Sequence, residues 1–314
     1  MDTLRAAVIG VGYLGRFHAQ KYAALPDCRL VALVDPRSEA LEPLARELGT
    51  AAYSDFRQLP GKVDVVSIVT PTPLHFEIAD FCLEAGLHVL LEKPITETVE
   101  QAQRLIDTAR RRGKVLQVGH LERFNPVIVG AEAMLTTPGF IECHRLAPFR
   151  ERGTDVNVVL DLMIHDLDLV QSIAGSEVVS LDAIGTPVFS REIDIANARI
   201  RFANGCVANA TASRVSLKTE RKLRIFQGDA YLSMDLHQKI LTVIRKLDPL
   251  PPNAPLPVSI QEQSFEPGDA LAAEIEAFLA SCRGERPVAV SGEAGLRALR
   301  MAVAITEAVG RVAR

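Results

Sequence analysis

The sequence lacks the features that mark membrane-spanning, disulfide-bonded or nucleic-acid-binding proteins. None of its apolar stretches is long enough to cross a bilayer. Its five cysteines are scattered without a CxxC pair, which fits a reducing cytoplasm and provides no metal-site spacing. A net charge of −4 gives no long-range attraction to nucleic acid or to an anionic membrane. We therefore expect a cytoplasmic protein with no metal, no nucleic-acid partner and no membrane association.

The composition is that of an ordinary globular protein with room for two domains. The chain has 314 residues, of which 48% are apolar and 24% charged. Over the first 119 or so residues, apolar strands alternate with helices. The predicted strands are Leu4–Ile9, Cys28–Val34, Val63–Val69, Leu87–Leu91 and Lys114–Val118. Continuous apolar strands between helices predict a doubly wound parallel sheet covered on both faces, an α/β N-terminal domain spanning residues 1–120.

A glycine-rich motif, G-x-G-x-x-G, directly follows the first strand. Its first glycine permits a tight turn, its second lets the backbone approach a pyrophosphate, and its third lets the next helix pack close to the strand. The unpaired N–H groups at the start of that helix would hold the pyrophosphate. The motif therefore predicts a bound dinucleotide, the alternative being a turn that only packs a helix. The predicted cofactor-binding residues are Gly10, Gly12, Tyr13, Leu14 and Gly15.

Asp35 ends the second strand and bears on which dinucleotide binds. It lies 20 positions after Gly15, where a carboxylate can accept hydrogen bonds from ribose hydroxyls. NADP carries a phosphate in that place, and two like charges about 4 Å apart cost roughly 1–4 kcal/mol. Arg37 could offset this by pairing with the phosphate. The sequence therefore predicts NAD, with NADP less favoured.

Two further motifs follow the third and fourth strands, at the edge where open parallel sheets bind ligands. The stiff loop Thr70-Pro71-Thr72 with His75 predicts cofactor contacts, the alternative being a helix start with Thr72 as N-cap. Glu92-Lys93-Pro94 closes the fourth strand, which puts Lys93 where a nicotinamide would react. Its ammonium could polarise a hydroxyl and relay a proton. The alternative is a surface lysine with Glu92 as its ion partner.

An unusual apolar helix is predicted at Val158–Ile173. At about 100° per residue, His165 lies roughly 40° from Asp161 and Asp168 roughly 20° to the other side, so all three share one narrow stripe. A carboxylate one turn from an imidazole can orient it, which suits a general base. The alternative is a core histidine with satisfied hydrogen bonds. Asp166 points away and is expected to be an exposed or structural acid.

Residues 121–314 form the second predicted domain, an α+β unit with a large, mostly antiparallel open sheet. In Asp194–Phe202, apolar and polar side chains alternate, and Asn204-Gly205 predicts a hairpin turn. A proline-rich loop is expected at 248–257. Further helices are predicted at Asn125–Leu135, Gly268–Cys282 and Gly292–Val312. Further strands are predicted at Phe140–Leu146, Cys206–Arg214, Lys222–Phe226, Tyr231–Leu236 and Lys239–Ile244.

Several polar residues are candidate substrate contacts. His120, Arg123 and Asn125 follow the fifth strand near the predicted crevice, and Asp168 lies on the apolar helix. Basic residues also cluster between 214 and 224. They could bind substrate phosphates, with Arg214 as the candidate, although a solvated hairpin or a subunit contact is the commoner explanation. This cluster comprises Arg214, Lys218, Arg221, Lys222 and Arg224.

Together these motifs resemble the glucose–fructose oxidoreductase/inositol dehydrogenase (Gfo/Idh/MocA) family. The resemblance covers the whole chain, from the glycine motif and the Thr-Pro-Thr loop to Glu-Lys-Pro and Asp-x-x-x-His. It implies a Rossmann domain and an NAD(P)-dependent dehydrogenase of sugars, cyclitols or nucleotide sugars. It also implies that Lys93 and His165 are the catalytic pair, with Asp161 as the third member. The open sheet would form the contacts of a homodimer or homotetramer.

Three segments, 119–126, 161–166 and 221–227, resemble a subgroup of UDP-N-acetylglucosamine 3-dehydrogenases. This finer resemblance implies oxidation of the sugar 3-hydroxyl to a 3-keto nucleotide sugar, on the route to a 3-amino sugar of lipid A. The first alternative is an inositol or free-sugar dehydrogenase of the same family. The second is a non-catalytic protein that senses NAD.

Overall fold

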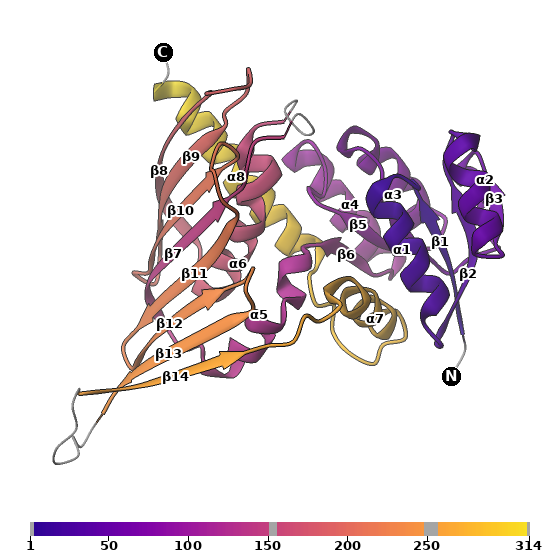
Figure 1. Cartoon of the computed structure of the whole chain (residues 1–314). Helices are drawn as coiled ribbons and strands as arrows, with labels where there is room; N and C mark the ends of the chain where they lie inside the picture. The colour runs from indigo at the N-terminus through magenta and orange to yellow at the C-terminus, as the bar shows by residue number, and fades with distance from the viewer. Residues whose placement is uncertain (1–2, 151–155, 248–256, 313–314) are drawn as a thin grey trace. The chain divides into compact units, whose positions relative to one another are not determined.

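The protein, seen in a computed structural model that describes residues 3–150, 156–247 and 257–312, has two units, each built on one sheet (Figure 1). The first unit consists of the chain up to Leu121 together with Asp269–Leu299, and the second takes Glu122–Gly268 and the chain from Arg300. The first unit thus includes a segment, 269–299, that sequence analysis assigns to the second domain. The domain boundary at residues 120 and 121 stays a prediction.

The first unit holds a six-stranded parallel sheet in the order β3-β2-β1-β4-β5-β6. This order, reversing direction between β1 and β4, confirms the doubly wound architecture expected from alternating strands and helices. The edge strand β3 is three residues long and was not among the predicted strands. The strands are β1 (Leu4–Ile9), β2 (Cys28–Val34), β3 (Ala51–Tyr53), β4 (Val65–Ile68), β5 (His88–Glu92) and β6 (Leu116–Gly119).

Helices cover the faces of this sheet, and their ends follow local sequence signals. Thr98 and Gln101 form a reciprocal capping box at the start of α4, and Gly113 ends that helix with φ of 61°. The short turns η1 (Phe56–Gln58) and η2 (Thr72–Leu74) fill loops at the sheet edge. The helices are α1 (Tyr13–Ala24), α2 (Ser38–Glu47), α3 (His75–Glu84), α4 (Val99–Arg112) and α7 (Ala270–Cys282).

Helix α7 comes late in the chain yet belongs to the core of the first unit. Its side chains Ile275, Phe278 and Leu279 are buried in the same apolar cluster as Val8 of β1 and Leu90 of β5. Burying an apolar side chain of this size stabilises a fold by about 1.5–3 kcal/mol. The helix is therefore part of this core.

The second unit holds an eight-stranded sheet in the order β14-β13-β12-β11-β7-β10-β9-β8. Only the described pair β10–β7 runs parallel, so the predicted mostly antiparallel open sheet is confirmed. The edge strands β8 and β14 were not predicted. The strands are β7 (Pro138–Leu146), β8 (Val178–Thr186), β9 (Ile195–Phe202), β10 (Val207–Ser213), β11 (Glu220–Gln227), β12 (Ala230–Asp235), β13 (Ile240–Lys246) and β14 (Val258–Ser264).

One face of this sheet is covered by helices and the other carries polar side chains. On β9, Ala198 and Ile200 are buried, whereas Asn197, Arg199 and Arg201 are exposed, as the alternating pattern predicts. Helix α6 packs on β7 and β10, and α5 packs on β12 and β13 (Figure 1). The helical segments within this unit are α5 (Pro126–Ala131), η4 (Glu132–Met134), η5 (Val159–Met163) and α6 (Ile164–Ala174), whereas η3 (Leu121–Phe124) and α8 (Gly292–Val312) each have residues in both units.

Two further sequence expectations concern a proline-rich loop and the lack of a membrane-spanning segment. Of the predicted proline-rich loop, residues 248–256 lie outside the part of the chain that the structure describes. Among the helices in the described ranges, none combines the length and apolar character needed to cross a bilayer.

Candidate functional site

The glycine motif forms a tight cradle between β1 and α1. Gly10 has φ of 89°, and a β-carbon there would lie 2.6 Å from the main-chain oxygen of Val69. A β-carbon on Gly15 would lie 1.8 Å from the main-chain oxygen of Gly10. At Gly12 the space is open, the nearest side-chain atom being Arg37 Nη2 at 4.0 Å. The first and third glycines are thus required by packing, and the second leaves room for a pyrophosphate.

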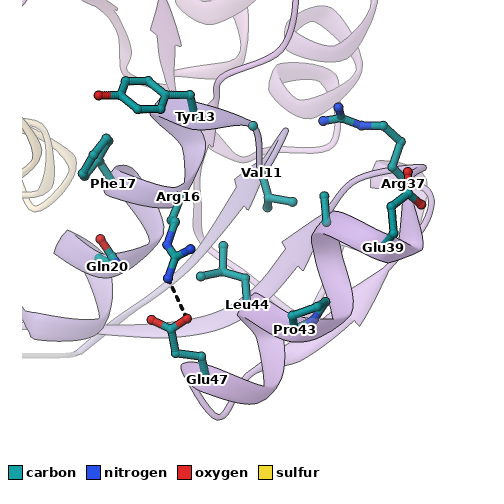
Figure 2. A pocket seen from close by; sticks show the side chains of 12 residues that line it. Val11, Tyr13, Arg16, Phe17, Gln20, Arg37, Glu39, Pro43, Leu44 and Glu47 are labelled. Atoms are coloured by element: carbon teal, nitrogen blue, oxygen red, sulfur yellow. Dashed lines mark hydrogen bonds and ion pairs between the residues drawn. The ribbon is translucent and has the colours of Figure 1, made fainter.

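A cavity of about 660 Å³ opens beside this cradle between α1 and α2 (Figure 2). Tyr13 and Phe17 of α1 line one side, and Arg37 and Pro43 line another. Tyr13 and Leu14 are largely exposed, at 66% and 45%. A volume of this size is within the range of small-molecule and cofactor sites. The predicted cofactor-binding residues Gly12, Tyr13 and Arg37 are therefore brought together around it.

Asp35 and Arg37 form a closed pair at the end of β2. Asp35 Oδ1 accepts hydrogen bonds from the main-chain N–H and Nε of Arg37, both at 3.0 Å, and Oδ2 accepts from Arg37 Nη2 and from Val11 N. Burial opposes ionisation of Asp35, but these hydrogen bonds outweigh it and lower its pKa. Asp35 is thus an anion already held by Arg37, which sequence analysis considered only as a partner of a phosphate.

His75 links the two loops that follow β4 and β5. Its Nδ1 lies 2.8 Å from the main-chain oxygen of Pro94, and its Nε2 lies 2.9 Å from that of Thr70. Both oxygens only accept, so a neutral ring donates to one of them and a doubly protonated ring to both. Burial lowers the pKa of His75, which favours the neutral ring. His75 therefore ties the Thr-Pro-Thr loop to the Glu-Lys-Pro turn from a buried position.

The Thr-Pro-Thr loop is not a helix start capped by Thr72, the alternative considered from the sequence. The turn η2 is preceded by Pro71 and has no side-chain cap, and α3 begins only at His75, so Thr72 as a helix N-cap is wrong. Thr70 Oγ1 is buried without a hydrogen-bond partner among the described residues. Such an atom next to Gly10 is suited to a polar group of a bound cofactor.

The side chain of Glu92, at the end of β5, is mostly buried, with 16% of its surface exposed. Its Oε1 accepts a hydrogen bond from His18 Nε2 at 3.1 Å, and its Oε2 accepts one from the main-chain N–H of Lys93 at 3.2 Å. Burial raises the pKa of Glu92, but the hydrogen bond from His18 and the charges of His18 and Lys93 hold it below its ordinary value. Sequence analysis missed His18, because nothing in its local pattern marks a contact with a distant strand.

The apolar helix begins with a π-helical turn. Residues Val159–Met163 form this turn, η5, and α6 continues from Ile164. The expectation of one regular α-helix from Val158 is therefore wrong, and the 40° separation calculated for Asp161 and His165 does not apply. Asn157 starts the helix, since its Oδ1 accepts from the N–H groups of Val159 and Leu160. Wide turns of this kind often occur at functional sites.

Asp161 and His165 lie on successive turns of this helix and are half-buried. Asp168 is only 2% exposed and is held by Arg123, with Nε–Oδ2 at 2.5 Å and Nη2–Oδ1 at 2.9 Å. Arg123 also donates to Ser172 Oγ at 2.6 Å. Two residues predicted to contact substrate are thus brought together as an ion pair, and their substrate-binding role stays a prediction.

A second ion-pair network fixes the other side of α6. Asp166 is 4% exposed and forms a bidentate pair with Arg145, at 2.9 and 2.8 Å. Arg145 also donates to Glu122 Oε1, and Asn125 Nδ2 donates to Glu122 Oε2, both at 2.9 Å. Of the two expectations for Asp166, exposed or structural, the structural one is therefore confirmed. Asn125 also caps α5 through Val127 N.

Arg214 is buried and bound within its own unit. Its Nε donates to Asp194 Oδ1 at 2.7 Å and its Nη1 to the main-chain oxygen of Val156 at 2.6 Å. Three more members of the basic cluster pair with acids: Lys218 with Glu220, Arg221 with Glu122 and Arg224 with Glu142. These contacts engage the four side chains with acids of the chain itself, and phosphate binding by Arg214 stays a prediction. His120, at the end of β6, is 1% exposed.

Comparison with known proteins gives a family and several relatives. Residues 4–120 match the model of the oxidoreductase family with an NAD-binding Rossmann fold, and residues 149–312 match that of its C-terminal α/β domain. The chain is 42% identical over 98% of both lengths to UDP-N-acetylglucosamine 3-dehydrogenase of Acidithiobacillus ferrooxidans. A crystal structure of that protein superimposes with a TM-score of 0.93, covering 99% of both chains at 41% identity.

A more distant relative is scyllo-inositol 2-dehydrogenase (NAD(+)) of Bacillus subtilis, 29% identical over 68% of both lengths. The two family models together cover most of the chain, and the first includes the glycine cradle, His75 and the Glu92–Pro94 turn. The protein is therefore an NAD-dependent oxidoreductase and belongs to the Gfo/Idh/MocA family.

Proposed function

We propose that this protein oxidises the 3-hydroxyl of UDP-N-acetylglucosamine to a ketone. The observation that carries the proposal is the 42% identity, over almost the full length of both chains, to a protein named for that reaction. The matching fold over 99% of both chains supports the same substrate. Its 3-keto product would then be aminated to a 3-amino sugar for lipid A, in the cytoplasm.

The proposed chemistry divides between the cofactor and three side chains. When bound, NAD would supply the hydride acceptor for oxidation of the carbinol carbon. His165 removes the proton of the substrate hydroxyl as general base, and Asp161 orients its imidazole. Lys93 holds the reacting oxygen and shares the proton relay. Positioning and charge stabilisation by these groups supply most of the protein's contribution to the rate.

The cofactor-binding residues of the proposal surround the cradle and the loops at the sheet edge. Gly12 would leave room for the pyrophosphate, the cavity between α1 and α2 would take the adenosine, and Thr70 Oγ1 would bond a polar group of the cofactor. The remaining cofactor contacts proposed are Gly10, Tyr13, Leu14, Gly15, Asp35, Arg37, Pro71, Thr72, His75, Glu92 and Lys93. The substrate contacts proposed are His120, Arg123, Asn125, Asp168 and Arg214.

A substrate screen tests this function directly. UDP-sugars, inositols and free sugars are offered with NAD, and the absorbance of the reduced cofactor is followed. We expect UDP-N-acetylglucosamine to give the highest kcat/KM, and the product to carry a ketone at position 3. Turnover of an inositol with no turnover of any UDP-sugar would replace the proposal by its first alternative, which the likeness to an inositol dehydrogenase keeps open.

A second alternative is a non-catalytic protein that senses NAD. Such a protein would give a stoichiometric NADH signal without turnover of any substrate in the screen. The basic cluster separates the substrate classes further, because a UDP group needs phosphate partners. If charge reversal at Arg214 and Arg221 leaves substrate affinity intact in a folded protein, the nucleotide-sugar assignment loses that support.

We further propose that the protein is a homodimer or homotetramer assembled through the open face of the eight-stranded sheet. That face carries exposed apolar side chains such as Ile184, whose strand neighbour Asn197 is exposed beside it. Exposed apolar residues on a sheet face are suited to contacts between subunits.

A further inference from the structure

Glu274 is a carboxyl group buried inside the first unit. Its side chain is 0% exposed, and neither Oε1 nor Oε2 has a hydrogen-bond partner among the described residues. It lies on α7, the helix that packs against α1 and β5. An ionised carboxylate is strongly disfavoured in such a place, because burial removes its water and no N–H group replaces it.

Glu274 interacts electrostatically with a second acid, Glu92, at the end of β5. Glu92 has the hydrogen-bond donors that Glu274 lacks, namely His18 Nε2 at 3.1 Å and the main-chain N–H of Lys93 at 3.2 Å. The charges of His18 and Lys93 also favour an ionised Glu92. The two carboxyl groups therefore have opposite preferences for the proton.

Other groups around Glu274 do not change which of the two carboxyl groups carries the proton. Tyr22 of α1 is neutral, since burial raises its pKa well above the ordinary value, and its hydroxyl pairs with Ser67 Oγ at 2.9 Å. Gln117 of β6 donates from Nε2 to the main-chain oxygen of Glu274 at 3.1 Å, not to its carboxyl group. The basic groups that act on Glu92 are thus His18 and Lys93, and among the described residues neither donates a hydrogen bond to the carboxyl group of Glu274.

We propose that Glu92 and Glu274 form a buried carboxyl pair that holds one proton, located on Glu274. Glu92 is then the single anion of the pair, and Glu274 is a positioning residue that keeps it so. Because Glu92 holds the main chain of Lys93, the pair fixes the start of the turn that carries this lysine. The role in catalysis rests on the proposed function of Lys93, whereas the proton on Glu274 does not.

The pair has a measurable effect on stability. Burial and the charge of Glu92 raise the pKa of Glu274 in the folded protein. Above the ordinary pKa of 4.5, the unfolded chain releases this proton while the folded protein keeps it. Stability is therefore lost as the pH rises, by about tenfold in the unfolding equilibrium constant per pH unit, until the folded pKa is reached.

Urea unfolding of three proteins tests the proton on Glu274. Wild type, Glu274→Gln and the matched control Glu276→Gln, an exposed acid on the same helix, are compared from about pH 5 to about pH 8. Glutamine imitates the neutral acid and does not titrate. We expect the folding equilibrium constant of Glu274→Gln, divided by that of wild type, to increase about tenfold per pH unit. The same ratio for Glu276→Gln should not increase with pH. If the free energy of unfolding of Glu274→Gln differs from that of wild type by the same amount at every pH, the proposed pair is wrong.

Steady-state kinetics test the positioning role separately. We expect Glu274→Leu to lower kcat severalfold with little change in KM or in NAD affinity, and Glu274→Gln to recover most of that loss. Equal kcat in wild type and Glu274→Leu would overturn the positioning role. The unfolding measurement needs no substrate, so it decides the location of the proton independently of activity. Absence of turnover by the wild type would count against the proposed function alone.

Discussion

Asp35 is the residue on which we expect the choice between NAD and NADP to depend. Both of its oxygens are occupied by Arg37, so binding a ribose hydroxyl requires the guanidinium to move or to share the carboxylate. The same guanidinium lies beside the open space at Gly12, with Nη2 at 4.0 Å from the position of a β-carbon there. We expect the pair to favour NAD, because removing Asp35 would release a cation suited to the additional phosphate of NADP.

This gives a prediction for Asp35→Ala. Loss of hydrogen bonds to a charged acceptor, worth about 1.5–3 kcal/mol, should weaken NAD roughly ten- to a hundredfold, and the released Arg37 should improve the use of NADP. The measurement is kcat/KM for both cofactors, with Asp107→Ala, an exposed acid on α4, as control. An unchanged ratio of the two values would remove Asp35 from the cofactor site.

His165→Ala gives the second prediction at this scale. The variant should bind NAD normally, since the glycine cradle is untouched, and should lose about 10²–10⁴-fold in kcat, as expected for removal of a general base. Fluorescence titration with NADH and initial rates are the measurements, and His237→Ala, an exposed histidine, is the control. Near-normal turnover in His165→Ala would end the assignment of the base.

At the scale of elements, His75 makes the loops after β4 and β5 one structural piece. Replacing it by Phe keeps a ring at this position but removes the hydrogen bond that the neutral imidazole donates to one of the two carbonyl oxygens, which should cost about 1–3 kcal/mol of stability. Because the Lys93 turn loses its tie, we also expect lower kcat/KM. Urea unfolding and initial rates are compared with those of His144→Phe, on the second unit. Wild-type values for both quantities in His75→Phe would show that the contacts are dispensable.

The apolar pattern predicted the long elements well, because the inner parallel strands are continuous apolar runs buried on both faces and the long helix α8 buries one face. Strands β1 and β2 and helix α8 have the predicted bounds. The strands it did not predict are β3, β8 and β14, which lie at sheet edges or are very short. Val258–Ser264 has only two partly buried residues, so its sequence carries little apolar signal.

From the sequence, candidate site residues could be predicted only where they lie in the glycine motif or directly after a predicted strand. The π-helical turn at Val159–Met163 has no distinct pattern, because the same apolar residues suit an ordinary helix. The hydrogen bond of Glu92 with His18, and its electrostatic interaction with Glu274, join residues far apart in the chain. Such contacts arise from packing of α1 and α7 on the sheet, and no local spacing indicates them.

At the scale of the whole molecule, the open sheet face leads to a prediction about assembly. If it forms subunit contacts, Ile184→Asp should lower the molecular mass in solution, because a buried, unpaired charge is costly. Light scattering measures the mass, and Ala133→Asp, at another exposed position of the second unit, is the control. A wild-type mass in Ile184→Asp would exclude the part of the face around Ile184 from the interface.

The late position of α7 in the chain has a consequence for biosynthesis. When the ribosome has released the first 121 residues, the nascent chain has every strand of its parallel sheet but lacks Ile275, Phe278 and Leu279, which complete that sheet's apolar cluster. The apolar core of the domain that is synthesised first is therefore completed only near the end of translation, when α7 becomes available. During that interval its exposed apolar surface is available to chaperones.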